Sequence, residues 1–230
     1  LGDVYKRQAK YNENDAIEWV STSNTADVEY TGVCKGGTNY YACGSTAVSG
    51  DAVSFVEKFD SNGIPGWGKS ATMLGRDVVL EKITANSRDE IIAVGYLEDD
   101  TADKGYIVKI DANSGEILWD RSLERNISGS GNSGGNGNDD IAAADVRCTA
   151  CYIDGNDQIY VVGSIDGRSP VNNGVGEFLI KYSPEGNILW QRENHTDHYT
   201  ALDGAPNMIP FDVKSDTDTE HTVVLSVDNQ

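Results

Sequence analysis

The sequence predicts an all-β protein built from repeated four-stranded antiparallel sheets, and three observations predict it. The 230 residues include 25 glycines and 5 prolines, and many of these turn-forming residues lie between short apolar runs. No stretch has the length and the 3.6-residue period of a substantial helix. Two sequence patterns also recur together along the chain, which is typical of an array of supersecondary units.

The first recurring pattern is a strand that contains lysine, followed by a turn that ends in glycine and then by tryptophan. Its three copies run from Phe55 to Trp67, from Ile107 to Trp119 and from Leu179 to Trp190. The second pattern is an apolar strand that ends at Gly44, Gly95 or Gly163. These glycines precede the tryptophan of the same copy by 23, 24 and 27 residues, so the two patterns belong to one unit.

Each unit is interpreted as four short strands, A to D in chain order. Strand B ends in the glycine, strand C carries the lysine and strand D carries the tryptophan. One such sheet cannot bury both of its faces alone, whereas radial stacking covers both faces and leaves only short edges. The predicted fold is therefore a β-propeller, as an incomplete arc of about four four-stranded antiparallel blades.

The elements are expected in the following order along the chain. Residues 1–8 are interpreted as a non-native scar, and residues 9–230 as a piece of a propeller. Ile17-Glu18-Trp19 marks strand D of a partial blade at 9–27, and Val223-Val224-Leu225-Ser226 marks strand B of a last partial blade at 205–230. The three complete blades between them are expected at about 28–75, 76–125 and 139–193. The chain is thus expected to be an internal part of a longer protein.

The lysine-to-tryptophan pattern, clearest in Lys109–Trp119 and Lys181–Trp190, resembles the repeats of bacterial extracellular propellers of the SBBP type. It is also similar to the PQQ-like repeat of quinoprotein and outer-membrane-assembly propellers. This resemblance implies blade packing and an extracellular, periplasmic or cell-surface location. The sequence departs from the quinoprotein docking motif, which has Ala where Ile110 stands and Thr-Gly where Ser114-Gly115 stands.

The charge balance excludes some classes of partner. The 18 Lys and Arg against 37 Asp and Glu give a net charge of −19, which repels phosphate backbones and argues against nucleic acid. No stretch approaches the roughly 18 apolar residues of a membrane span. The expected function is an extracytoplasmic binding or structural scaffold, with an unknown protein, glycan or small molecule as partner and no cofactor. The alternatives are a PQQ-dependent oxidoreductase and a glycan-active hydrolase or lyase; no catalytic residue and no metal site is assigned.

The four cysteines form two close pairs in the sequence. If the first A–B hairpin turns at Thr38-Asn39, Cys34 and Cys43 lie opposite each other, and we expect a disulfide in an oxidising compartment. Cys148 and Cys151 point to opposite faces of an extended strand. A disulfide, buried free thiols, and a metal or redox role all stay open for this second pair.

The lengths of the connections differ between the two ends of the predicted blades. In a meander, the A–B and C–D turns share one end, while the B–C and D–A loops share the other, which we call the loop face. All the long insertions fall on the loop face, so we expect ligands to bind there. Because the chain is acidic, a cationic or metal-bridged ligand is favoured, although the loop with the two histidines could equally be only a solvated connection. The candidate contacts are Asp99, Asp100, Asp139, Asp140, Arg168, His195, Asp197 and His198.

Overall fold

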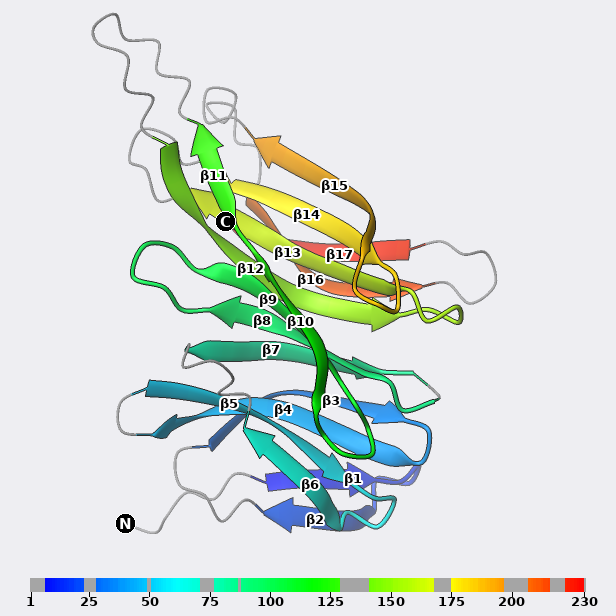
Figure 1. Ribbon diagram of the computed structural model, residues 1–230. Helices are drawn as coiled ribbons and strands as arrows, with labels where there is room; N and C mark the ends of the chain where they lie inside the picture. Colours follow the sequence, from blue (N-terminus) through cyan, green and yellow to red (C-terminus); the bar gives the residue numbers. More distant parts are fainter. Residues whose placement is uncertain are drawn as a thin grey trace, which may run out of the picture.

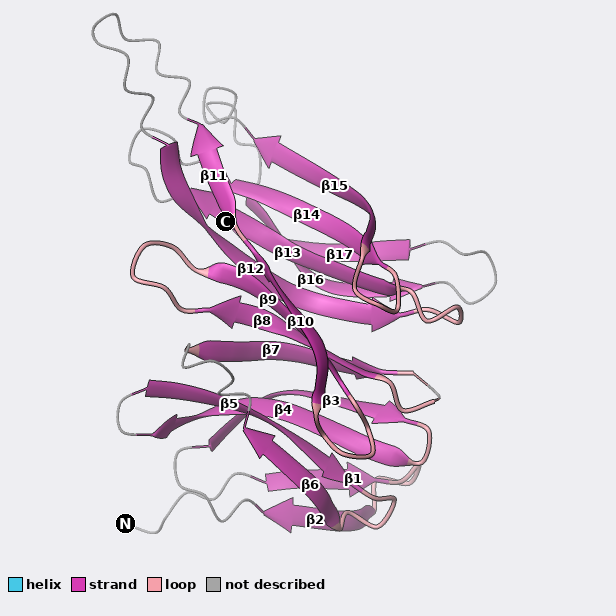
Figure 2. Cartoon of the chain, in the orientation of Figure 1, coloured by secondary structure: helices cyan, strands magenta, loops and turns pink. Residues whose placement is uncertain are grey.

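The computed structural model describes residues 7–22, 28–48, 51–70, 77–86, 88–128, 141–167, 175–196, 207–215 and 222–229. Within these ranges every regular element is a β-strand, and 17 strands form five antiparallel sheets (Figure 2). In the same residues, no helix is long and apolar enough to cross a membrane.

Three of the sheets are complete four-stranded meanders. Blade 1 contains β3 (Val28–Gly36), β4 (Asn39–Val48), β5 (Asp51–Phe59) and β6 (Pro65–Ser70). Blade 2 contains β7 (Val78–Ala85), β8 (Ile91–Leu97), β9 (Lys104–Ile110) and β10 (Ile117–Leu123). Blade 3 contains β12 (Ile141–Ile153), β13 (Ile159–Gly167), β14 (Val175–Tyr182) and β15 (Ile188–Thr196), and β11 (Arg125–Ser128) pairs with β12 as a fifth strand.

Two further hairpins lie at the ends of the series. The N-terminal half-blade is β1 (Arg7–Tyr11) with β2 (Ile17–Thr22), and the C-terminal half-blade is β16 (Asn207–Ser215) with β17 (Thr222–Asn229). The first strand of each complete blade packs on the first strand of the next unit, in the order β3, β7, β12 and β16. The sheets therefore stack as an open arc with the two half-blades at opposite ends (Figure 1). This arrangement confirms the predicted fold class, an incomplete β-propeller arc.

Blade 2 has apolar residues buried on both faces, as radial stacking requires. In β8 the run Ile91 to Gly95 is buried throughout. Ile91 joins a cluster shared with blade 1 that contains Tyr41 and Val56, while Ile92 joins a cluster shared with blade 3. Full burial of each large aliphatic side chain contributes about 1.5–3 kcal/mol. Packing between blades is therefore the main source of stability.

The recurrent glycine does not end strand B, as the sequence predicted, but lies inside it, since β4, β8 and β13 continue past Gly44, Gly95 and Gly163. Each of these glycines faces a bulge in the neighbouring A strand. The pairing register shifts opposite Gly44, Gly95 and Gly163 in blades 1, 2 and 3. At Gly95 an added Cβ would lie 1.9 Å from the carbonyl oxygen of Val79, and the other two positions give 2.0 and 2.1 Å. Any side chain would overlap the backbone of the bulge, so this repeated glycine is required by the close approach of the two strands.

The recurrent lysine and tryptophan join blade 1 to blade 2 and blade 2 to blade 3. Lys58 Nζ and Trp67 Nε1 of blade 1 both donate to the carbonyl oxygen of Ala112 in the C–D turn of blade 2, each at 2.8 Å. Blade 2 repeats this lysine–tryptophan contact, with Lys109 Nζ at 3.0 Å and Trp119 Nε1 at 3.1 Å from the carbonyl oxygen of Pro184 in blade 3. The repeated sequence pattern thus encodes a contact between blades.

The predicted disulfide between Cys34 and Cys43 is wrong for this structure. The first hairpin turns at Gly37-Thr38, one residue earlier than expected, so Cys34 pairs with Tyr41 and Cys43 pairs with Gly32. Gly37 has a φ of 50°, which suits the first residue of this two-residue turn. The two cysteines are diagonal neighbours, and the thiols of all four cysteines are free.

Candidate binding face

The described part of the loop face is strongly acidic. It comprises Asp77 before β7, the β8–β9 loop, Glu124 after β10, and the part of β12 and β13 where Asp145 pairs with Asp166. Its carboxylates are Asp77, Glu98, Asp99, Asp100, Asp103, Glu124, Asp145 and Asp166, and its basic residues are Lys104 and Arg147. A cation approaching this end of the blades therefore meets a field that attracts it.

The β8–β9 loop is fixed to blade 3 through Asp103, whose side chain is 7% exposed. The carboxylate accepts hydrogen bonds from Arg147 Nη2 at 2.6 Å and Arg147 Nε at 3.0 Å. The Asp103 amide donates to Asp145 Oδ1 at 2.7 Å, and the amide of Val146 donates to the Asp103 carbonyl oxygen at 2.8 Å. The Arg147 guanidinium also stacks over the ring of Tyr96, 4.3 Å from its centroid. These contacts hold the loop in one position relative to two blades.

Lys104 connects the loop to the end of β10. Its Nζ lies 3.0 Å from Glu124 Oε1 and 3.2 Å from Asp99 Oδ2. The hydrogen bonds to Glu124 and Asp99 raise the pKa of Lys104. The amide of Thr101 and the Lys104 ammonium lower the pKa of Asp99. Asp99 is therefore a carboxylate over the whole physiological pH range and is already partnered.

The predicted contact residues are only partly placed by the structure. Asp99 and Asp100 both lie in the β8–β9 loop, and Asp100 is exposed. His195 lies on β15 opposite Gly176, and nothing is described of its side chain. The others, Asp139, Asp140, Arg168, Asp197 and His198, lie outside the described residues. In the described part of the chain, no three His, Cys, Asp or Glu side chains are grouped so as to hold a metal ion.

Sequence reasoning missed the contacts of Asp103, Arg147 and Tyr96, which position the loop. Asp103 and Arg147 are 44 residues apart and belong to different blades, so only the register between blades brings them together.

Polar side chains at the opposite end, the turn face, are used between blades. Asn39 Nδ2 of blade 1 donates to Asp89 Oδ2 in the A–B turn of blade 2 at 3.0 Å. Asn86 Nδ2 of blade 2 donates in the same way to Asp157 Oδ1 of blade 3 at 2.7 Å, and Arg88 forms an ion pair with Asp157. The turn face therefore holds the arc together.

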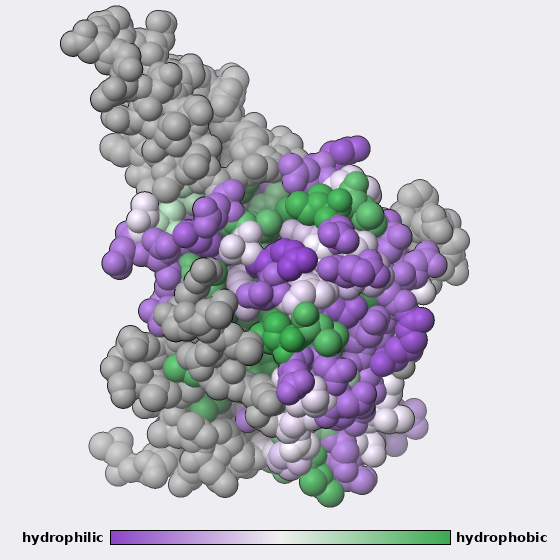
Figure 3. All heavy atoms as spheres, in the orientation of Figure 1, coloured by the Kyte–Doolittle hydropathy of each residue, from purple (hydrophilic) through white to green (hydrophobic). Residues whose placement is uncertain are grey.

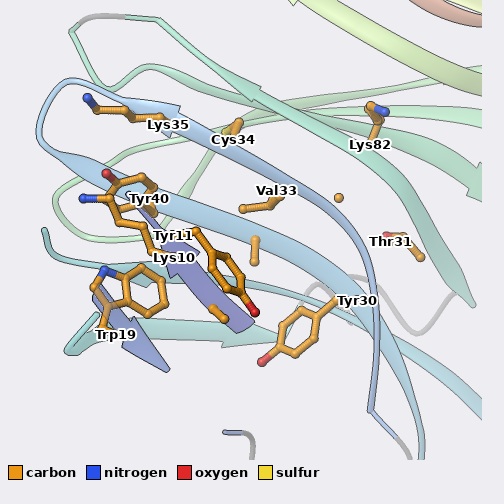
Figure 4. A pocket seen from close by; sticks show the side chains of 13 residues that line it. Lys10, Tyr11, Trp19, Tyr30, Thr31, Val33, Cys34, Lys35, Tyr40 and Lys82 are labelled. Carbon is orange, nitrogen blue, oxygen red and sulfur yellow. The ribbon is translucent and has the colours of Figure 1, made fainter. Parts of the chain in front are cut away.

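A groove of about 750 Å³ lies between the N-terminal half-blade and blade 1. Its walls carry aromatic and basic side chains (Figure 4). Trp19 and Tyr40 meet edge to face with ring centroids 5.9 Å apart, and Lys10 Nζ lies 5.3 Å from the Tyr40 centroid. Lys35 and Lys82 also line the groove, which is thus locally basic in an acidic chain.

Neither a protein-family model nor a curated protein sequence matches this chain. Among solved structures, the chain is similar to an endo-arabinase from Bacteroides thetaiotaomicron, with 11% identity and a TM-score of 0.48. The likeness covers 86% of this chain and 74% of that chain. At this level of likeness the match carries no information about activity.

Proposed function

We propose that this chain is a binding module built on a β-propeller scaffold, which takes a cationic ligand on its loop face. The observation that carries the proposal is a difference between the two ends of the blades in how their polar side chains are used. On the turn face, polar groups such as Asn39 and Asp157 are engaged in contacts between blades. On the loop face, the Asp103–Arg147 pair fixes a loop in which Glu98 and Asp100 are exposed, while Asp99 is paired with Lys104.

A fixed loop favours binding because less conformational freedom is lost when the ligand arrives. Glu98 and Asp100 are exposed in this loop, so their charges are accessible to a ligand. The net charge of −19 adds a long-range attraction that raises the association rate of cations. A basic peptide segment fits this chemistry better than a polyanion. The resemblance of the repeats to those of extracellular propellers supports an extracytoplasmic setting.

The experiment compares two neutralised variants that carry the same change in net charge. Glu98→Gln with Asp100→Asn alters two exposed carboxylates of the loop face, and Glu13→Gln with Glu116→Gln alters exposed turns at the other end. The probe is a fluorescently labelled octalysine peptide, and its binding is followed by anisotropy. We expect the loop-face variant to weaken binding by about 3- to 10-fold, since each partly exposed charge contributes about 0.5 kcal/mol or more.

The turn-face variant is expected to change the affinity by less than about twofold, because salt screens charges that lie far from the bound peptide. Equal weakening in both variants would mean that the peptide responds only to the net charge. That outcome, or binding that is unchanged in the loop-face variant, refutes the proposed site.

A further inference from the structure

A second cavity, of about 230 Å³, lies between blade 2 and blade 3. Its apolar lining consists of Leu123 at the end of β10, Val146, Ile165, Phe178 and Ile180 in β12 to β14, and Ile188 in β15. The side chains from β12 to β14 are at most 4% exposed and belong to the cluster on which Leu123 packs. The cavity is thus built into the junction between two complete blades, away from both ends of the series.

Polar residues line the cavity where it opens to solvent. They are Ser122, Glu124 and Gln191, and all three are exposed. Among the described lining residues, Glu124 is the only one with a charge. Arg121, the neighbouring cation on β10, donates to the carbonyl oxygen of Gly186 and does not line the cavity. A mostly apolar lining with a few polar groups is the usual form of a ligand site, in which the polar groups set the orientation of the ligand.

Glu124 connects this cavity to the carboxylates of the β8–β9 loop. Lys104 Nζ lies 3.0 Å from Glu124 Oε1 and 3.2 Å from Asp99 Oδ2, so two carboxylates and one ammonium leave a net charge of −1 in this group. The exposed Glu98 and Asp100 of the same loop add two further negative charges. A ligand that enters the cavity therefore places its polar part next to a negatively charged rim, which favours a cation.

The volume of the cavity fits one large apolar side chain. It is about seven to eight times the 30 Å³ that one water molecule occupies in the liquid, and it is smaller than drug-sized sites of about 300–1,000 Å³. Leucine, methionine and phenylalanine side chains have this size and chemistry. Because most of the apolar lining is buried and held in complete sheets, little conformational freedom of the protein is lost when such a side chain binds.

We propose that this cavity anchors the ligand of the loop face, and that the ligand is a basic peptide segment with one large apolar side chain. The inference rests on the proposed function, because the cationic side chains of the same segment bind the loop-face carboxylates. The apolar side chain fills the cavity, and its flanking cations lie at Glu124 and Asp100. Charge attracts any basic segment, whereas a cavity beside the charges selects the segments that have an apolar residue among basic ones.

The test compares two fluorescently labelled peptides of equal length and charge. Each has four lysines on either side of a central residue, which is phenylalanine in one peptide and serine in the other. Binding is followed by anisotropy, and the ratio of the two dissociation constants measures the cavity because the charges are the same. We expect the serine peptide to bind about tenfold more weakly. Equal affinities overturn this inference and leave the proposed function standing, whereas no binding of either peptide refutes both.

Two variants then locate the preference for phenylalanine. Ser122→Phe places a ring at the mouth of the cavity, and Ile188→Ser removes an apolar part of its lining. We expect the ratio to fall below about twofold in Ser122→Phe and to about threefold in Ile188→Ser. Near-ultraviolet circular dichroism checks that each variant is folded.

The matched controls carry the same substitutions at residues that do not line the cavity. Ser61→Phe lies in an exposed turn, and Leu189→Ser alters a side chain that is 49% exposed, against 52% for Ile188 on the same strand. Both controls should keep a ratio of about tenfold. A preference for phenylalanine that survives both Ser122→Phe and Ile188→Ser overturns the proposal.

Discussion

Replacing Gly95 with alanine tests whether the bulge in each A strand requires the recurrent glycine in strand B. The added Cβ would lie 1.9 Å from the carbonyl oxygen of Val79, and 2.9 Å from the Cα of Leu80. Real Cβ contacts are essentially never shorter than 3.0 Å, so the two strands must separate by at least 1.1 Å at this point. The atoms involved belong to the backbone and cannot rotate away.

The cost has two parts. Overpacking of this kind costs about 1–3 kcal/mol. Separating β7 from β8 at the bulge weakens one or two backbone hydrogen bonds, each of which contributes about 1 kcal/mol. We therefore expect a loss of about 3 kcal/mol in the free energy of unfolding, which lowers the Tm by about 6–12 °C for a chain of this size.

Gly155→Ala is the matched control, because nothing lies within 4 Å of a Cβ added at Gly155 and its φ is not positive. Urea unfolding followed by tryptophan fluorescence measures both variants, and an unchanged m-value keeps the comparison valid. The control should differ from wild type by less than about 0.5 kcal/mol. If Gly95→Ala loses less than about 1 kcal/mol, the close approach does not explain the recurrent glycine.

Three further predictions concern the contacts between blades and the buried thiols. Trp119→Phe keeps an aromatic ring but removes the N–H donor to Pro184 together with part of the indole surface, and should cost at least about 1 kcal/mol in chemical unfolding; no change would mean that the hydrogen bond contributes nothing to stability. Arg147→Met removes both guanidinium bonds to the nearly buried Asp103 and should cost about 2 kcal/mol, and Arg147→Lys should restore only part of it because one ammonium cannot replace the paired donors. Burial raises the pKa of Cys43 to about 11 and also raises that of Cys148 above the usual 9.0, so the folded chain keeps these protons while the unfolded chain loses them. Stability should therefore fall as the pH rises from about 9 towards 11, by up to about 1.4 kcal/mol per pH unit for each thiol, and Cys43→Ala should reduce this slope in urea titrations at fixed pH.

The repeat was predictable from the sequence because its residues perform the same task in more than one blade. The lysine and tryptophan reappear wherever one blade meets the next C–D turn, and the glycine reappears wherever an inner strand bulges. Physical constraints that recur at a fixed spacing leave a pattern that self-comparison detects. The radial stacking followed from the need to cover both faces of each sheet.

The details that the sequence did not reveal depend on single local choices or on distant partners. A turn at Gly37-Thr38 instead of Thr38-Asn39 changes the partner of Cys34 to Tyr41, so one residue of register removed the expected disulfide. The Asp103–Arg147 pair could not be predicted, since no local pattern relates two residues in different blades. On the face drawn in Figure 3, hydrophilic residues cover most of the described surface and apolar residues form small patches.

The lysine–tryptophan contact has a consequence for how such chains can grow. Each C–D hairpin carries both the donors and an acceptor of this contact. In blade 2, Lys109 and Trp119 donate to blade 3, while the carbonyl oxygen of Ala112 accepts hydrogen bonds from blade 1. A duplicated segment of about 50 residues therefore carries both sides of its own junction and fits next to any other copy. Gene duplication or deletion in units of one blade preserves the lysine–tryptophan contact at the junctions that remain. A change in the number of blades can therefore keep this contact, whereas a pair such as Asp103–Arg147 belongs to one described junction.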